Sequence, residues 1–153
     1  MKLVSLCEKT QKKVIFILIV NLMCTMKAKI KTLGLLHDTC LKEIKPINNG
    51  FHFFFSFYLG DNKEYTVELI SNEIANVRCT EHYRDNKTNN INIIDLHDVD
   101  CIKAEQHEDL FEILLEDIEK GTIIKLNFLG KQSQLIGNIK ELKEFWDIDE
   151  MAE

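Results

Sequence analysis

The stretch FHFFFSFYLGDNKEYTVELIS, residues 51–71, decides the fold. Successive side chains of an extended strand point to opposite faces, so alternate residues share a face. In the first half of the stretch this rule collects five apolar side chains on one face: Phe51, Phe53, Phe55, Phe57 and Leu59. Residues 65–71 alternate in the same way, and GDNKE at 60–64 has the composition of a turn. The stretch therefore predicts an antiparallel hairpin with one buried face.

The flanking residues extend this hairpin into a meander. Residues 74–83 predict a third strand with Ala75, Val77 and Cys79 on one face. Residues 91–102 predict a fourth strand after a polar loop. On the N-terminal side, a short strand or helix is expected to end before Pro46, because proline disfavours a helical conformation in the residue that precedes it.

Residues 105–121 carry apolar residues at helical spacing, which predicts an amphipathic helix. The apolar stripe of this helix consists of Leu110, Phe111, Leu114, Leu115 and Ile118. Acidic residues crowd its start, where the helix dipole favours negative charge, and Gly121 follows at the position of a C-terminal cap. We expect this helix to pack on the aromatic face of the meander.

The C-terminal part predicts a strand at residues 122–130, a hairpin partner at 131–137 and a short helix at 138–146. Asn138 and Glu141 have the spacing of a capping box at the start of that helix. The fold class is therefore α+β: an antiparallel β-meander packed on one amphipathic helix, with a further hairpin and a short C-terminal helix.

The length of 153 residues and the hydrophobic fraction of 45% fit one domain with a core of its own. We expect residues 26–153 to form that domain, after an apolar N-terminal segment, residues 1–25. The apolar run at 14–23 spans only about 15 Å as a helix, half of a bilayer core. Basic residues precede it as in a secretion signal, but no small-residue cleavage site follows. The segment remains a packed element, an extension, or a signal or membrane anchor.

The charge is distributed unevenly along the chain. Residues 1–77 contain ten Lys or Arg and seven Asp or Glu, whereas residues 78–153 contain nine and eighteen, within a net charge of −6. Residues 95–119 are the most acidic part, with ten acidic residues against Lys103. Such a surface repels phosphate backbones and attracts basic proteins. We therefore expect a basic protein partner and no nucleic acid.

Five cysteines lie at wide spacing, which favours free thiols in a reducing cytoplasm over a disulfide framework. One set of residues has loosely zinc-like spacing: Cys79, His82, His97 and Cys101. Cys79 and His82 would point to opposite faces of a strand, so these four are weak candidate ligands and no metal is predicted. The segment DLHDVD, residues 95–100, groups carboxylates but lacks the spacing and turn glycine of a calcium loop.

The sequence contains no phosphate-binding loop, nucleophile elbow or dinucleotide fingerprint, so no cofactor and no enzymatic activity are predicted. The hypothesis that fits best is a small acidic binding protein of the cytoplasm. Immunity proteins and antitoxins, which neutralise basic proteins, are of this general kind. The residues expected to contact the partner are Glu108, Glu112, Glu116, Asp117, Glu119 and Trp146. The alternative is an exported or membrane-tethered domain, with residues 1–25 as its signal or anchor.

Overall fold

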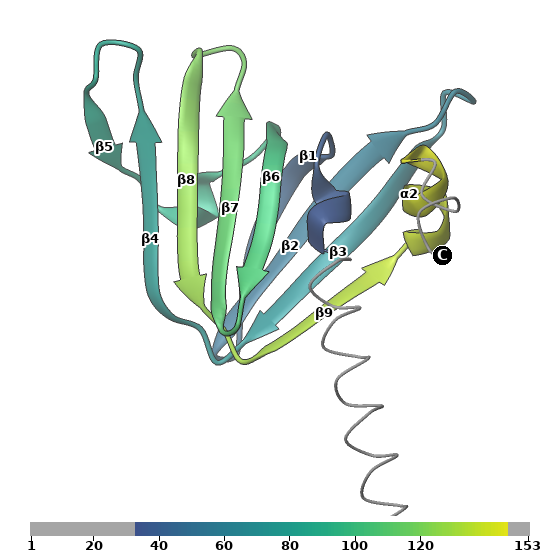
Figure 1. Cartoon of the computed structure of the whole chain (residues 1–153), viewed down its shortest axis with the longest axis horizontal. Helices are drawn as coiled ribbons and strands as arrows, with labels where there is room; N and C mark the ends of the chain where they lie inside the picture. The colour runs from purple at the N-terminus through teal and green to yellow at the C-terminus, as the bar shows by residue number, and fades with distance from the viewer. Residues whose placement is uncertain (1–32, 147–153) are drawn as a thin grey trace, which may run out of the picture. The chain divides into compact units, whose positions relative to one another are not determined.

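The computed structural model describes residues 33–146, which belong to the unit Thr32–Glu153. These residues form a nine-stranded antiparallel sheet with one short C-terminal helix (Figure 1). None of the helices in this part of the chain is long and apolar enough to cross a membrane. The apolar run at 14–23 and the domain boundary at residue 26 lie outside the described residues, so the expectations about them stay predictions.

The elements in chain order are η1 (Gly34–Leu36), β1 (Cys40–Ile47), β2 (Gly50–Tyr58), β3 (Glu64–Asn72), β4 (Ala75–His82), β5 (Thr88–Asn90), η2 (Ile93–Asp95), β6 (Val99–His107), β7 (Leu110–Asp117), β8 (Thr122–Leu129), β9 (Gln132–Gly137) and α2 (Ile139–Phe145). In the sheet the strands follow the order β5-β4-β8-β7-β6-β1-β2-β3-β9. Sequential hairpins make up two groups, β1-β2-β3 and β6-β7-β8. The two groups join where β1 pairs with β6 at only two positions, Cys40 with Asp100 and Leu41 with Val99.

The connections between the two groups explain the strong curvature of the sheet. β3 and β4 are six places apart in the strand order, yet only Glu73 and Ile74 connect them. Gly130 and Lys131 connect β8 to β9 in the same way. Connections this short force the two groups to converge at one end, and Figure 1 shows the strands of both groups meeting there. Gly130 lies close to Ser71 on β3, and the absence of a side chain allows this, because a Cβ on Gly130 would lie 2.5 Å from Ser71 Oγ.

The core lies between the two groups. The ring of Phe128 on β8 stacks on Phe111 of β7, with centroids 4.8 Å apart, and on Phe53 of β2, with centroids 5.6 Å apart. All three rings are fully buried. Phe53, Phe55 and Phe57 all face this core, which confirms the buried face predicted for residues 51–59. Phe51 is partly buried against the same core.

The end away from the convergence is covered by the short helices. The ring of Phe145 in α2 packs against Phe57, with centroids 5.7 Å apart, and Leu142 is fully buried. The indole Nε1 of Trp146 donates a hydrogen bond of 2.9 Å to the carbonyl oxygen of Leu35 in η1. The α-helix that packs against the core is therefore the short C-terminal helix α2.

The prediction of an amphipathic helix at residues 105–121 is wrong, because this segment contains the end of β6 and the whole of β7. The buried residues of β7 are Phe111, Ile113 and Leu115, which have period two. Leu114 lies between them on the outer face. Leu110 and Leu114 are four residues apart, which is also the spacing of an apolar stripe on a helix. β7 has a sheet neighbour on each side, so both of its ladders of backbone hydrogen bonds are satisfied as a strand.

Two predicted strand pairings, one in the meander and one in the further hairpin, are also wrong. β4 pairs with β8 and β5 instead of β3, and β9 pairs with β3 instead of β8. A bulge between Ala75 and Arg78 shifts the faces of β4, so Cys79 is buried while Ala75 and Val77 are exposed. Residues 91–98 form η2 and irregular chain, and the strand expected there begins only at Val99.

The structure differs from two local predictions, at Pro46 and at the start of α2. β1 runs through Pro46, which is tolerated because β1 pairs with β6 only near Cys40 and leaves that edge open at Pro46. The capping box at the start of α2 does not form. The side-chain oxygen of Asn138 instead accepts a hydrogen bond of 3.1 Å from the backbone nitrogen of Thr66, which ties α2 to β3.

Candidate functional site

An open pocket of about 690 Å³ lies where the ends of β4, β7 and β8 face the segment that links β5 to β6. The β4 side contributes Glu81, and the turn from β7 to β8 contributes Asp117, Glu119 and Lys120. The opposite wall comes from residues 90–99, which include η2. Five carboxylates and one lysine line this acidic pocket: Glu81, Asp95, Asp98, Asp117, Glu119 and Lys120.

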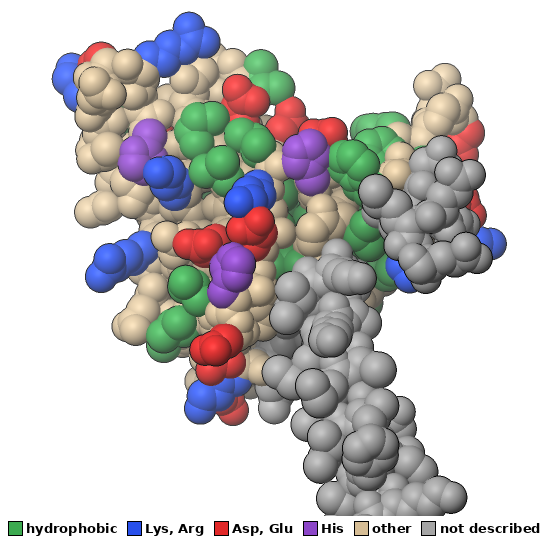
Figure 2. All heavy atoms as spheres, in the orientation of Figure 1, with side chains coloured by type: hydrophobic (Ala, Val, Ile, Leu, Met, Phe, Trp, Pro, Cys, Tyr) green, Lys and Arg blue, Asp and Glu red, His purple; other side chains and the backbone are tan. Residues whose placement is uncertain are grey.

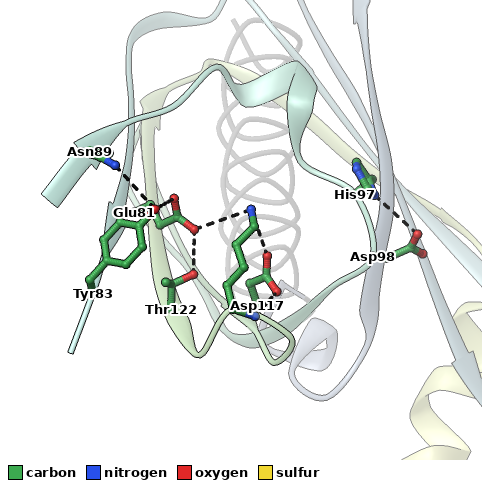
Figure 3. A network of polar contacts seen from close by, with 8 residues as sticks. Glu81, Tyr83, Asn89, His97, Asp98, Asp117 and Thr122 are labelled. Carbon is green, nitrogen blue, oxygen red and sulfur yellow. Dashed lines mark hydrogen bonds and ion pairs between the residues drawn. The ribbon is translucent and has the colours of Figure 1, made fainter. Parts of the chain in front are cut away.

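Glu81 is the buried acid of the pocket, with only 4% of its surface exposed. The bulge in β4 places it on the inner face, two residues beyond Cys79. Its Oε1 accepts a hydrogen bond of 2.7 Å from the hydroxyl of Thr122, and its Oε2 accepts one of 2.8 Å from the hydroxyl of Tyr83. Figure 3 shows these three side chains directed towards one another. Both carboxylate oxygens are therefore satisfied, as a buried charge requires.

Lys120 supplies the positive charge next to this carboxylate. Its Nζ lies 3.3 Å from Asp117 Oδ2 and 3.8 Å from Glu81 Oε1. The hydrogen bond to Asp117 raises the pKa of Lys120, and the negative charge of Glu81 raises it further, so the ammonium group stays charged. The hydrogen bond that Tyr83 donates to Glu81 raises the pKa of the phenol as well.

Asp117 organises the turn that presents Lys120. Its side-chain Oδ1 accepts a hydrogen bond of 3.1 Å from the backbone nitrogen of Lys120, and its carbonyl oxygen accepts one of 2.8 Å from Gly121. Gly121 has φ +66°, a conformation that glycine adopts without a steric cost. The turn therefore holds the Lys120 backbone in place, while 63% of its side chain remains exposed.

The opposite wall is fixed by polar contacts of its own. The side chain of Asn92 accepts a hydrogen bond of 3.3 Å from the backbone nitrogen of Ile94, which starts η2. Asp98 lies 3.1 Å from Lys42 Nζ and 3.5 Å from His97 Nδ1. The hydrogen bond from Lys42 lowers the pKa of Asp98, so this carboxylate is ionised at neutral pH. Within residues 33–146, Asp95 and Glu119 have no ion-pair partner and remain acceptors at the pocket rim.

The five acidic residues predicted to contact a partner are divided among three places. Asp117 and Glu119 line the acidic pocket, together with Glu81, Asp95 and Asp98. Glu112 and the half-buried Glu116 lie on the outer face of β7, and Glu108 lies in the loop from β6 to β7, at the far end of that strand. Because residues 110–117 form a strand, these acidic residues point to both sides of the sheet, and the structure brings together only part of the set.

The outer face of β6 and β7 carries a second cluster of charges. Glu105 and Glu112 are directly opposite each other on neighbouring strands, a like-charge pair that is unfavourable by itself. Lys103 lies 2.9 Å from Glu105, and His107 lies 3.3 Å from Glu105 and 3.8 Å from Glu112. The hydrogen bond from Lys103 lowers the pKa of Glu105. The charge of Lys103 compensates the pair in part, and Figure 2 shows acidic, basic and apolar side chains intermingled over this face.

The weak zinc candidates are not brought together. Cys79 is buried on β4 and Cys101 is buried on β6, three strand positions away, which corresponds to about 14 Å along the sheet. His82 lies on the outer face of β4, and His97 is exposed beside Asp98. Burial raises the pKa of Cys79 to about 11 and that of Cys101 to about 12, so both thiols stay protonated at neutral pH. Zinc binds thiolates at about 2.3 Å, so these four residues do not form a tetrahedral site.

Trp146 lies at the end of α2 and is occupied by contacts within the chain. Besides the hydrogen bond to Leu35, its ring packs edge-on against Phe145 and in a tilted arrangement against His37, with centroids 5.2 Å away in both cases. The half-buried indole thus fastens α2 to η1, and Trp146 is not among the residues that line the acidic pocket.

Two residues that line the acidic pocket, Glu81 and Lys120, were missed by the reasoning from sequence, as were Tyr83 and Thr122, which donate hydrogen bonds to Glu81. One signal was available for Glu81, because it follows Cys79 at strand spacing and so places an acid on a buried face. Thr122 and Lys120 lie about forty residues away along the chain, and no local pattern connects them to Glu81.

Comparisons with family models, with curated proteins and with solved structures find no match to this chain.

Proposed function

We propose that this protein is a small, non-enzymatic binding protein of the cytoplasm that recognises a basic partner protein through its acidic pocket. Neutralisation of that partner, in the manner of an immunity protein or antitoxin, is the role that we assign to it. The observation that carries the proposal is the gathering of five carboxylates around one pocket that contains a single lysine.

The charge of the whole chain supports the same role. A net charge of −6, concentrated in the C-terminal half of the sequence, attracts a basic protein over distances up to about a Debye length. Charge complementarity of this kind mainly accelerates association and selects the partner. The same field disfavours nucleic acid, whose phosphates would be repelled.

Two exposed apolar side chains beside the acidic pocket are available to bind the partner and add affinity. Ile118 in the turn from β7 to β8 is 68% exposed, and Ile94 in η2 is 46% exposed. Each is next in sequence to a carboxylate of the acidic pocket, Ile118 to Asp117 and Glu119, and Ile94 to Asp95. Apolar anchors beside a charged rim are a common arrangement in protein interfaces.

The assignment to the cytoplasm rests on the cysteines. Cys40, Cys79 and Cys101 are free thiols in the described part of the chain, and free thiols persist in reducing compartments.

The test is affinity capture from cells of the source organism, with wild-type protein and two charge-reversal variants compared by quantitative mass spectrometry. The rim variant combines Asp95→Lys and Glu119→Lys, and the matched control combines Glu43→Lys and Glu64→Lys on β1 and β3. We expect a basic protein that is captured by wild type and by the control, is lost with the rim variant, and is released at about 0.5 M salt. Equal capture by all three proteins would contradict the proposal.

A further inference from the structure

Lys120 shows what kind of group the floor of the acidic pocket accepts. Its ammonium lies between two carboxylates, at 3.3 Å from Asp117 and 3.8 Å from Glu81. The distance of 3.8 Å to Glu81 is too long for a hydrogen bond, so the buried carboxylate holds Lys120 by charge alone. Because the lysine side chain is 63% exposed, it is free to move away into solvent without unfolding the turn.

The rim of the pocket has acceptors left for a second cation. Asp95 on one wall and Glu119 on the other have no ion-pair partner among residues 33–146, and the pocket between them has a volume of about 690 Å³. Once Lys120 is counted, the lining retains four negative charges in excess, five carboxylates less one ammonium. An incoming cation is therefore attracted both to the rim and to the floor.

We infer that an arginine side chain of the basic partner enters this pocket and displaces Lys120 from Glu81. Lys120 is then an internal plug that competes with the partner for the same carboxylates. Arginine fits better than lysine, because a guanidinium group carries five donors in one plane and is desolvated more easily than an ammonium group. Several carboxylates around one pocket match such a donor set. This inference rests on the proposed function, since it names the group through which the basic partner is held.

The experiment uses the full chain and an acetylated, amidated tetra-arginine peptide, followed by backbone amide chemical shifts and by calorimetry. We expect shifts at Glu81, Asp95 and Glu119, and none at Glu105 or Glu112 on the outer face. Asp95→Asn and Glu119→Gln are substitutions of exposed residues, so they leave the fold intact, and each should weaken peptide binding about threefold or more.

Lys120→Met separates a plug from an ordinary structural lysine. If Lys120 competes with the peptide, its removal should strengthen binding about threefold or more. The matched control is Lys125→Met, which changes the net charge equally but lies exposed on the outer face of β8, and it should change binding less than twofold. Equal strengthening by both variants would overturn the inference, because long-range charge would then explain the effect. Shifts spread evenly over the acidic surface would overturn it too.

The outcomes also separate this inference from the proposed function. If the peptide fails to bind in the pocket while capture of a basic protein still depends on Asp95 and Glu119, the proposed function stands and the entry of an arginine is wrong. If the peptide binds and Lys120→Met strengthens it while no rim-dependent partner is captured, the pocket is a cation site and the proposed function is wrong.

Discussion

The hydroxyl of Thr122 donates a hydrogen bond of 2.7 Å to Glu81, a residue 41 positions earlier in the chain. Thr122 is the first residue of β8 and is 1% exposed, and Glu81 is 4% exposed near the end of β4. This contact joins the strand that carries the buried acid to the turn that carries Lys120.

Replacement of Thr122 by valine should lower the free energy of unfolding by about 1–3 kcal/mol, because valine has nearly the same shape but leaves one oxygen of a buried carboxylate without its donor. Urea unfolding measures the loss. The control is Thr66→Val on β3, where the side chain is exposed and the change should be below about 0.5 kcal/mol. Equal losses for the two variants would show that the Thr122 hydroxyl has no special role.

Replacement of Phe128 by alanine should cost about 3–5 kcal/mol, because the ring is fully buried and stacks on both Phe111 and Phe53. The cavity would open where the two strand groups pack together. Phe54→Ala is the comparison, since the half-buried Phe54 stacks on His52 at the outer face, and its loss should be clearly smaller. A smaller loss for Phe128→Ala would contradict the central position of this ring in the core.

The thiols of Cys79 and Cys101 should react slowly with iodoacetamide at pH 8, because burial raises the pKa of Cys79 to about 11 and that of Cys101 to about 12. Thiolate is the reactive form, and the folded protein contains almost none of it at these sites. Mass spectrometry of labelled peptides, with and without urea, gives the rates. Labelling of both sites at the rate of the unfolded chain would contradict their burial.

The same two thiols give stability a pH dependence on the alkaline side. In the unfolded chain they ionise near pH 9, whereas in the folded protein they stay protonated up to about pH 11. The unfolded state therefore binds fewer protons in this window, and stability should fall as the pH rises from 9 to 11. Urea unfolding of Cys101→Ala at pH 8 and pH 10 should show a weaker dependence than wild type. An unchanged dependence would assign it to other groups.

Replacement of Glu108 by glycine should raise the free energy of unfolding by about 0.5–1 kcal/mol. Glu108 has φ +54° in the loop between β6 and β7, a conformation that costs a non-glycine residue about 1–2 kcal/mol. The greater conformational freedom of glycine in the unfolded chain offsets part of the stability gained by removing this cost. Thermal unfolding measures the gain. Glu112→Gly within β7 is the control and should be destabilising, so a gain in both variants would contradict the explanation.

The sequence predicted several elements correctly because their signals are local. Residues 51–59 alternate over a full strand, and β2, Gly50–Tyr58, follows them almost residue for residue. The strands at 65–71, 74–83 and 122–130 and the helix at 138–146 match β3, β4, β8 and α2 within about two residues. The turn at 60–64 separates β2 from β3 as expected.

The failure at residues 105–121 has a definite cause. Leu110, Leu114 and Ile118 repeat at helical spacing, while Phe111, Ile113 and Leu115 repeat at strand spacing. Both patterns fit the same segment, and β7 lies inside the nine-stranded sheet between β6 and β8, where Leu114 on its outer face has neighbours as well. Only the pairing with β6 and β8 distinguishes the two conformations.

The candidate site was predicted only in part. Asp117 and Glu119 were named from the acidic composition of their segment, but their association with Glu81 depends on the pairing of β4 with β8. The sequence did not predict that pairing, because β4 lies between β3 and β5 along the chain and was assigned to the meander.

The sequence by itself determined the hairpin of β2 and β3, the buried aromatic face of β2 and the acidic character of the C-terminal half. These follow from the period of side chains along an extended strand and from composition, which are both local. Only the tertiary structure decided which strands are neighbours, that β7 is a strand, and that Glu81, Asp117 and Lys120 share a pocket. The physical reason is that strand pairing is stabilised by backbone hydrogen bonds and core contacts between distant segments. Such contacts leave no fixed spacing in the sequence.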